Sequence, residues 1–178
     1  MQHLMIDIET LAKTPNSVIL SLGAVKFNPY TIDDPTDGLY FRIDVDEQIE
    51  LGRVVDDSTL QWWSTQPDDV RDDVFSDDDR LSLDEVRIHL NKMVVGIEAV
   101  WAQGTVFDIG ILENLYRQKN WPKPWQFWQI RDSRTLLNTF GDNRELNKKG
   151  SHNAFMDAWE QAKAVQTIYN KFNIQKCK

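Results

Sequence analysis

A single stretch decides the fold of this chain: Leu4-Met5-Ile6-Asp7-Ile8-Glu9-Thr10. Aliphatic residues at positions 4, 6 and 8 alternate with the residues at 5, 7 and 9, which is the period-two pattern of a β-strand with one buried face. Because side chains two positions apart leave the same face of a strand, Asp7 and Glu9 point the same way. Unpaired carboxylates are costly to bury, and a divalent cation would offset that cost. A strand end that reaches solvent is the ordinary alternative, since about one Asp-x-Glu is expected by chance in so acidic a chain.

Outward from this strand, the sequence predicts two more strands and then an alternation of helices and strands. The second and third strands are expected at 17–27 and 39–45, joined by a connection that contains proline and glycine. Helices are expected at 58–66, 82–94, 108–119, 133–140 and 153–172, and short strands at 98–102 and 127–130. The order βββ–α–β–α–β–α predicts an α/β fold, a mixed β-sheet flanked by helices, in a single domain spanning residues 1–178.

The composition is that of an ordinary soluble globular protein, with 41% hydrophobic and 27% charged residues. No run is apolar for long enough to span a bilayer, and no signal peptide is visible. The single cysteine, Cys177, can form no internal disulfide, which fits a reducing cytoplasm. The net charge of −8 argues against a protein that grips nucleic acid over a large surface. It argues less against an enzyme that holds one strand end through metal ions.

Part of the acidic excess is local, because seven aspartates crowd the stretch from Asp68 to Asp79, relieved only by Arg71 and Arg80. We interpret this stretch as a solvated acidic loop. It lacks the spaced ligands and the central glycine of a calcium-binding loop. A structural domain that nevertheless binds calcium there is one alternative function, and it predicts calcium-dependent stability without hydrolysis.

Two further motifs carry groups that could act in catalysis. Asp108 follows a short strand and opens a helix, where a carboxylate is also an ordinary helix cap. His152 and Asp157 form a His-x4-Asp pair around the start of the last helix, and about a third of one such pair is expected by chance. Histidine suits the role of a general base that takes a proton from an attacking water. The alternative for His152 is an exposed loop residue, so no single motif decides the function.

In combination, the order Asp-x-Glu, Asp, His-x4-Asp resembles the DEDDh exonucleases of the DnaQ-like superfamily. The segments 6–10 and 152–158 are close to the first and last motifs of that group. Three other blocks, at 58–63, 107–112 and 127–135, are similar to the exonuclease A type of T-even bacteriophages and its small bacterial relatives. The resemblance runs from about residue 4 to residue 170.

The resemblance implies an RNase H-like fold and hydrolysis of single nucleotides from the 3′ end of single-stranded DNA. It also implies two Mg²⁺ or Mn²⁺ ions per active site, which oxygen ligands suit. Asp7 would bridge both ions, and Glu9 and Asp157 would complete the nucleophile side. Asp108 would act largely through the water shell of the second ion. His152 would be the general base, a contribution of roughly 10²–10⁴ in rate.

Substrate contacts follow from the same analogy. Thr10 and Leu11 are expected to meet the terminal nucleotide, Leu11 as an apolar wedge and Thr10 through its backbone. Phe107 is a candidate to stack on a base, with a core aromatic as the equal alternative. Phosphate contacts are expected from four basic residues, Arg131, Arg134, Lys148 and Lys149. For the two arginines, an internal salt bridge is the alternative.

The expected partners are therefore 3′ ends of nucleic acid, with no membrane. Single-stranded DNA comes first, and an exoribonuclease or oligonucleotide trimmer of the same fold is the nearest alternative, because sensing of the 2′-hydroxyl depends on groove shape. A non-catalytic nucleic-acid-binding module is an alternative from another class; it would have lost a ligand or the base, and all five positions are present. Some relatives are dimers, so a homodimer is compatible with the resemblance. The expected location is the cytoplasm, the host's if the chain is phage-encoded.

Overall fold

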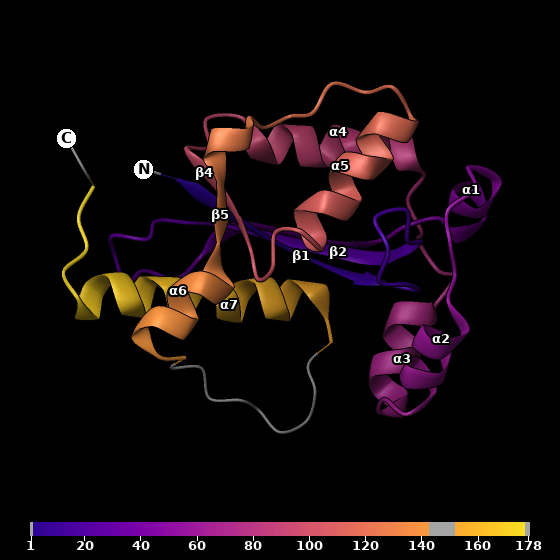
Figure 1. Ribbon diagram of the computed structural model, residues 1–178, viewed down its shortest axis with the longest axis horizontal. Coiled ribbons are helices and arrows are strands. Elements are labelled where there is room, and N and C mark those ends of the chain that lie inside the picture. Colours follow the sequence, from indigo (N-terminus) through magenta and orange to yellow (C-terminus); the bar gives the residue numbers. More distant parts are fainter. Residues whose placement is uncertain (1, 143–151, 177–178) are drawn as a thin grey trace.

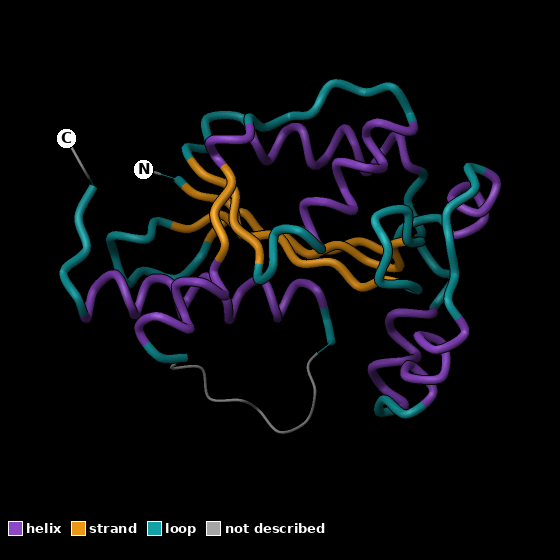
Figure 2. Tube along the Cα trace, viewed as in Figure 1, coloured by secondary structure: helices purple, strands orange, loops and turns teal. Residues whose placement is uncertain are grey.

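The computed structural model describes residues 2–142 and 152–176 and is built on a five-stranded sheet (Figures 1 and 2). The strands are β1 (His3–Thr10), β2 (Ile19–Phe27), β3 (Thr36–Arg42), β4 (Ala99–Ala102) and β5 (Ile130–Asp132). Their order in the sheet is β3-β2-β1-β4-β5. The first three strands pair antiparallel, whereas β4 is parallel to β1 and β5 is parallel to β4. The mixed sheet expected from the sequence is confirmed.

Helices cover both faces of this sheet (Figure 1). They are α1 (Val45–Glu50), α2 (Asp57–Ser64), α3 (Asp68–Phe75), α4 (Leu83–Val94), α5 (Asp108–Gln118), α6 (Ser133–Phe140) and α7 (Ala154–Lys171). In the view of Figure 1, α4 and α5 lie above the sheet, α6 and α7 lie below it, and α2 and α3 stand together at one end. Within the described residues, no helix has the length and hydropathy needed to cross a membrane.

Strand β1 is central and divides the core by the alternation of its side chains. Leu4, Ile6 and Ile8 belong to the large cluster formed with residues of α4 and α5. Met5 belongs to a second cluster on the other side, which includes Ala162 of α7. The face of β1 that carries Asp7 and Glu9 is thus the face covered by α7.

Two of the predicted strand boundaries are wrong, each for a local reason. The third strand ends at Arg42 instead of position 45, because the Asp44 side chain accepts from the Glu47 backbone N–H and starts α1. The last strand begins at Ile130, since residues 127–129 form a short 3₁₀ turn. In contrast, the capping box of Ser82 and Glu85 at the start of α4 is confirmed.

The acidic stretch is not a loop, which corrects our interpretation of residues 68–79. Its first eight residues form α3, whose Val74 is buried. Val70 and Val74 lie one turn apart and pack against a cluster that contains Leu20 of β2 and Trp63 of α2. This apolar pair attaches an otherwise acidic helix to the end of the sheet.

Candidate active site

The acidic pair of β1 faces the first two turns of α7. Asp7 Oδ1 accepts a hydrogen bond from Gln161 Nε2 at 2.8 Å. In the sheet Asp7 lies opposite Gly23 of β2, and a Cβ atom on Gly23 would fall 2.2 Å from backbone atoms of Ala154 and Phe155. A side chain at position 23 would therefore push α7 away from the sheet. Glycine at this point lets the start of α7 approach the two carboxylates of β1.

The start of α7 brings the histidine and the last aspartate to Glu9. One potential ligand atom from each of Glu9, His152 and Asp157 lies within 4.8 Å of the other two. Asp157 is in the first turn of α7, and its backbone N–H donates to the Asn153 carbonyl at 2.9 Å. Residues from opposite ends of the chain thus meet in one cluster, as the resemblance to DEDDh exonucleases implies.

Asp108 joins this cluster from α5. Its side chain is only 4% exposed, and Oδ1 accepts from the Ile8 backbone N–H at 3.3 Å. The N-terminus of α5 shows no side-chain cap hydrogen bond. Asp108 is therefore directed at β1, which disfavours the helix-cap alternative.

Burial and the neighbouring carboxylates destabilise the charged forms of Asp7 and Glu9. Burial raises the pKa of Asp7 well above its usual range, and the charges of Asp108 and Glu9 add to the rise. Burial, followed by the charge of Asp157, raises the pKa of Glu9 to about 8. Burial also raises the pKa of Asp108 to about 7. Raised pKa values favour the neutral forms of these carboxyl groups. A bound cation would stabilise their charged forms.

The residues present fit a divalent metal ion of the Mg²⁺ or Mn²⁺ kind. The donor set is rich in carboxylate oxygens, which these ions prefer. Beside Asp7, the Oε1 atom of Gln161 is buried and has no hydrogen-bond partner within the described part of the chain. A cation with its water shell would satisfy both the carboxylates and this amide oxygen.

His152 is half-buried and packs against the tryptophan pair of α2. Its ring stands edge-on to Trp62, with centroids 4.8 Å apart and planes at 84°, and lies 6.2 Å from Trp63. Its backbone has φ +24°, a conformation that few residues other than glycine adopt. The imidazole is therefore held beside Glu9 and Asp157 by contacts of α2.

A recess of about 200 Å³ opens beside Glu9. It is lined by Ile8, Glu9, Thr10, Ala12, Lys13, Thr59, Trp62, Trp63 and Phe107. Thr10 and Phe107 are thus placed where the analogy expects contacts with a nucleotide. Leu11 is not, because it is 5% exposed and packs in the cluster that contains Trp63. Leu11 is part of this core cluster, and its role as a wedge stays a prediction.

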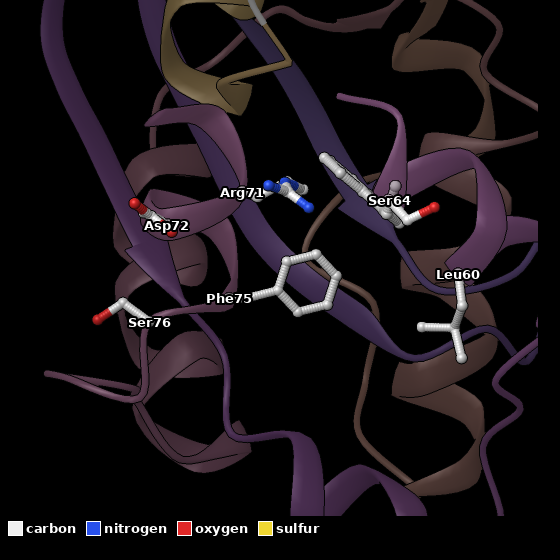
Figure 3. A pocket seen from close by; sticks show the side chains of 7 residues that line it. Leu60, Ser64, Arg71, Asp72, Phe75 and Ser76 are labelled. Atoms are coloured by element: carbon white, nitrogen blue, oxygen red, sulfur yellow. The ribbon is translucent and has the colours of Figure 1, made fainter. Parts of the chain in front are cut away.

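A larger cavity, of about 660 Å³, lies between α2 and α3 (Figure 3). Its lining residues are Leu60, Trp63, Ser64, Arg71, Asp72, Phe75 and Ser76. It shares Trp63 with the smaller recess but contains none of the four clustered carboxylates. Chemistry rather than size therefore selects the smaller recess as the candidate site.

The structure separates the two arginines predicted to contact phosphate. Arg134 is exposed at the start of α6, donates from Nη2 to the Gln103 carbonyl at 2.9 Å, and lines a recess of about 340 Å³ together with Phe107. Its positive charge opposes the effect of burial on the pKa of Asp108. Both observations put Arg134 beside the site.

Arg131 lies elsewhere, which corrects its predicted role. It pairs with Trp101 across the sheet and donates to the carbonyls of Trp128 and Ile130. Burial lowers the pKa of His3 to about 4, and the nearby charge of Arg131 contributes to the lowering. His3 is at the opposite end of β1 from Glu9. Lys148 and Lys149 fall outside the described residues.

Two residues of the site escape motif reasoning. Gln161 follows Asp157 by four positions, so both lie on one face of α7, and this spacing is the signal that could have identified Gln161. Gly23 interrupts an apolar strand, where glycine often marks a close approach of another backbone.

Known proteins of similar sequence and structure agree with this geometry. The model of the Rv2179c-like 3′–5′ exoribonuclease domain matches residues 2–169. An exodeoxyribonuclease of Enterobacteria phage T4 is 25% identical over 158 residues, which cover 75% of this chain and 69% of the phage protein.

Two solved structures share the fold. The nuclease domain of 3′hExo, a DEDDh family member bound to rAMP, superposes with a TM-score of 0.57 at 12% identity, covering 99% of this chain and 94% of that one. Cell-death related nuclease 4 gives a TM-score of 0.54 at 15% identity, covering 96% of this chain and 64% of that one. The sheet and its helices therefore form the RNase H-like fold of these nucleases. The chain belongs to the Rv2179c-like 3′–5′ exoribonuclease domain family and is a 3′–5′ exonuclease of the DnaQ-like superfamily.

Proposed function

We propose that this exonuclease removes single nucleotides from the 3′ end of single-stranded DNA, with two divalent ions and His152 as general base. The observation that carries the proposal is the convergence of Glu9, His152 and Asp157, whose ligand atoms lie within 4.8 Å of one another. Asp7 and Asp108 lie close to this group. In addition to the effect of burial, the charge of Asp108 raises the pKa of Glu9, and the charge of Glu9 raises the pKa of Asp7.

The carboxylates of Asp7, Glu9, Asp108 and Asp157 would hold the ions. When bound, Mg²⁺ or Mn²⁺ would stabilise the charge that develops on the scissile phosphate and favour ionisation of an attacking water. His152 would take the proton of that water; the support for this role is that one of its ring nitrogens lies within 4.8 Å of carboxylate oxygens of Glu9 and Asp157. Since His152 is only half-buried, it can pass the proton on to solvent.

The recess beside Glu9 would receive the terminal base. Its lining includes three aromatic residues, Trp62, Trp63 and Phe107, and Trp62 is 42% exposed. Stacking on such rings tolerates any base and is worth about 1–3 kcal/mol for each base. Lys13 and Arg134 line the adjoining recess and supply positive charge for the phosphates.

Single-stranded DNA is the first choice of substrate because the similarity to the phage exodeoxyribonuclease spans most of both chains. RNA is the second candidate, since the family model is that of an exoribonuclease domain. The two substrates differ in the 2′-hydroxyl, which a protein senses through backbone and groove contacts.

The test is cleavage of matched 5′-labelled DNA and RNA oligomers with Mg²⁺ or Mn²⁺. We expect a ladder that shortens from the 3′ end, is abolished by Asp7→Ala and is strongly slowed by His152→Ala. Asp69→Ala, at an exposed acid of α3, is the matched control and should cleave like wild type. A faster reaction on RNA would transfer the proposal to the second substrate. Full activity of His152→Ala would contradict the role of the base.

Three other expectations stay predictions: a single domain over residues 1–178, a homodimer, and a cytoplasmic location.

A further inference from the structure

Asp73 of the acidic helix α3 is hydrogen-bonded both to β3 and to the start of α7. Its Oδ2 atom accepts from the Tyr40 hydroxyl at 2.7 Å and from Asn153 Nδ2 at 3.0 Å. Arg42 Nη1 donates both to Oδ1 at 3.1 Å and to the Asp73 backbone carbonyl at 3.0 Å. Asp73 is thus fixed to β3 by two side chains and, through Asn153, is joined to the start of α7.

Asn153 stands between the candidate base and a candidate metal ligand. Its Oδ1 atom caps α7 by accepting from the Met156 backbone N–H at 3.1 Å. Its backbone carbonyl accepts from the Asp157 N–H at 2.9 Å. His152 is its immediate neighbour in the chain. A shift of Asn153 would therefore move His152 and Asp157 together.

The backbone at His152 requires support from outside. Its φ of +24° lies in the region that residues other than glycine rarely adopt, and such conformations persist only where neighbouring contacts fix them. The ring is fixed by Trp62 of α2. Asn153, which follows His152 in the chain, is fixed by its hydrogen bond to Asp73 of α3.

We propose that Asp73 is a positioning residue for the exonuclease reaction: through Asn153 it fixes the turn that carries His152 and the first turn that carries Asp157. The proposal rests on the function proposed above for these two residues. It also gives a role to one aspartate of the acidic stretch. Asp73 is hydrogen-bonded to the sheet and to α7, whereas Asp69, one turn earlier on α3, is exposed. Asp73 lines neither of the two recesses proposed to receive the nucleotide, so it acts through Asn153.

The test exchanges the two partners of the hydrogen bond. Asn153→Asp keeps an oxygen for the helix cap but sets a carboxylate against that of Asp73. We expect kcat on a 5′-labelled oligomer to fall about 10- to 100-fold, the cost of a small misplacement of catalytic groups, while KM changes less than about 3-fold. Adding Asp73→Asn restores a donor and an acceptor in reversed order, and should recover at least about 5-fold of kcat. A loss that arises from the change at Asn153 without involving Asp73 would show no such rescue.

Controls separate this proposal from the proposed function. Asp69→Asn should leave kcat unchanged, and melting curves should show that each variant is folded. If Asn153→Asp does not fold, Asp73→Ala and Asn153→Ala replace it, and the double variant should be no slower than the slower single one. Absence of rescue in the exchange, or additive losses in the alanine pair, would overturn the role of Asp73. His152→Ala is measured in parallel. If it is strongly slowed while the exchange shows no rescue, only the positioning role fails, whereas full activity of His152→Ala would remove the base itself.

Discussion

The two ends of β1 present the same face to the same helix, yet their chemistry is opposite. At the first end, His3 and Met5 lie in an apolar and aromatic region with Phe27 and Trp101. At the other end, Asp7 bonds to Gln161 and Glu9 meets Asp157. The change takes place within two residues along one strand.

This difference shows that one end of the strand contributes mainly to stability and the other mainly to function. The aromatic end buries apolar surface and holds His3 in the neutral form through burial and a hydrogen bond from Trp101 Nε1 at 2.9 Å. The acidic end holds carboxylates that repel one another. Packing at the first end therefore supports α7 in the position that the second end requires.

The largest expected effect is that of Asp7→Asn, which keeps the shape but removes one charge from the acidic end. Activity should fall about 10³-fold, comparable with the loss of a preorganised electrostatic group in other enzymes. Because the mutual repulsion is relieved, the metal-free protein should become more stable. Steady-state kinetics and denaturant unfolding in EDTA check both outcomes.

Met5→Ala, two residues away on the same face, is the matched control. It should lower the free energy of unfolding by about 2–5 kcal/mol and leave the activity of the folded fraction close to that of wild type. A loss of activity in Met5→Ala equal to that in Asp7→Asn would show that the two ends do not act separately.

The next effect is expected from Gly23→Ala, which should act on the acidic end through α7. The new methyl group would meet the backbone of Ala154 and Phe155, so α7 must shift. We expect kcat to fall about 10²-fold, with a loss of stability of about 1–3 kcal/mol. Gly110→Ala is the control, since its methyl group would meet nothing closer than 3.9 Å. Wild-type kinetics in Gly23→Ala would mean that α7 need not lie so close to β1.

A smaller effect is expected on how the stability of the metal-free protein depends on pH. The folded pKa of Glu9 is raised by burial and by Asp157 to about 8, and burial raises that of Asp108 to about 7, above the values of an unfolded chain. The folded state therefore keeps protons that the unfolded state has released, and stability in EDTA should fall as pH rises from 6.5 to 8. Saturating Mg²⁺ should remove this decline. Metal-free stability that is flat or rises over this range would contradict the repulsion at the acidic end.

The smallest effect is expected from His3 at the aromatic end. It concerns the dependence of stability on pH below 6.5. Burial lowers the folded pKa of His3 to about 4, so its contribution to stability is present above 6.5 and is lost as pH falls toward 4. We compare the slope of the free energy of unfolding against pH in wild type and in His3→Gln. The two slopes should differ only below pH 6.5. An equal slope in both proteins down to pH 4 would mean that His3 is not held neutral. Near pH 7 the two slopes should coincide.

Much of this arrangement follows from local sequence. The alternation around Asp7 and Glu9 predicts their strand and common face, and the spacing of His152 and Asp157 predicts their place at the start of α7. These are short-range signals, which depend on backbone geometry alone. The mixed sheet flanked by helices also follows from the order of elements along the chain.

What could not be predicted depends on contacts between distant segments. Leu11 turns into the core because the pairing of β1 with β2 shifts register between Glu9 and Thr10, and no local pattern reveals this shift. Arg131 faces the aromatic end because β5 pairs with β4 beside Trp101. Helix α3 was missed because two valines among many aspartates decide its packing.

The central claim is that the acidic end of β1 binds divalent ions through Asp7. The most direct test is a titration of the folded protein with Mn²⁺ in the presence of a nucleoside monophosphate, with free Mn²⁺ followed by electron paramagnetic resonance. We predict two ions bound per chain in wild type and a clear loss of binding in Asp7→Asn, while Asp69→Asn binds like wild type. Undetectable saturable binding to wild type, or equal binding by Asp7→Asn, would contradict the account.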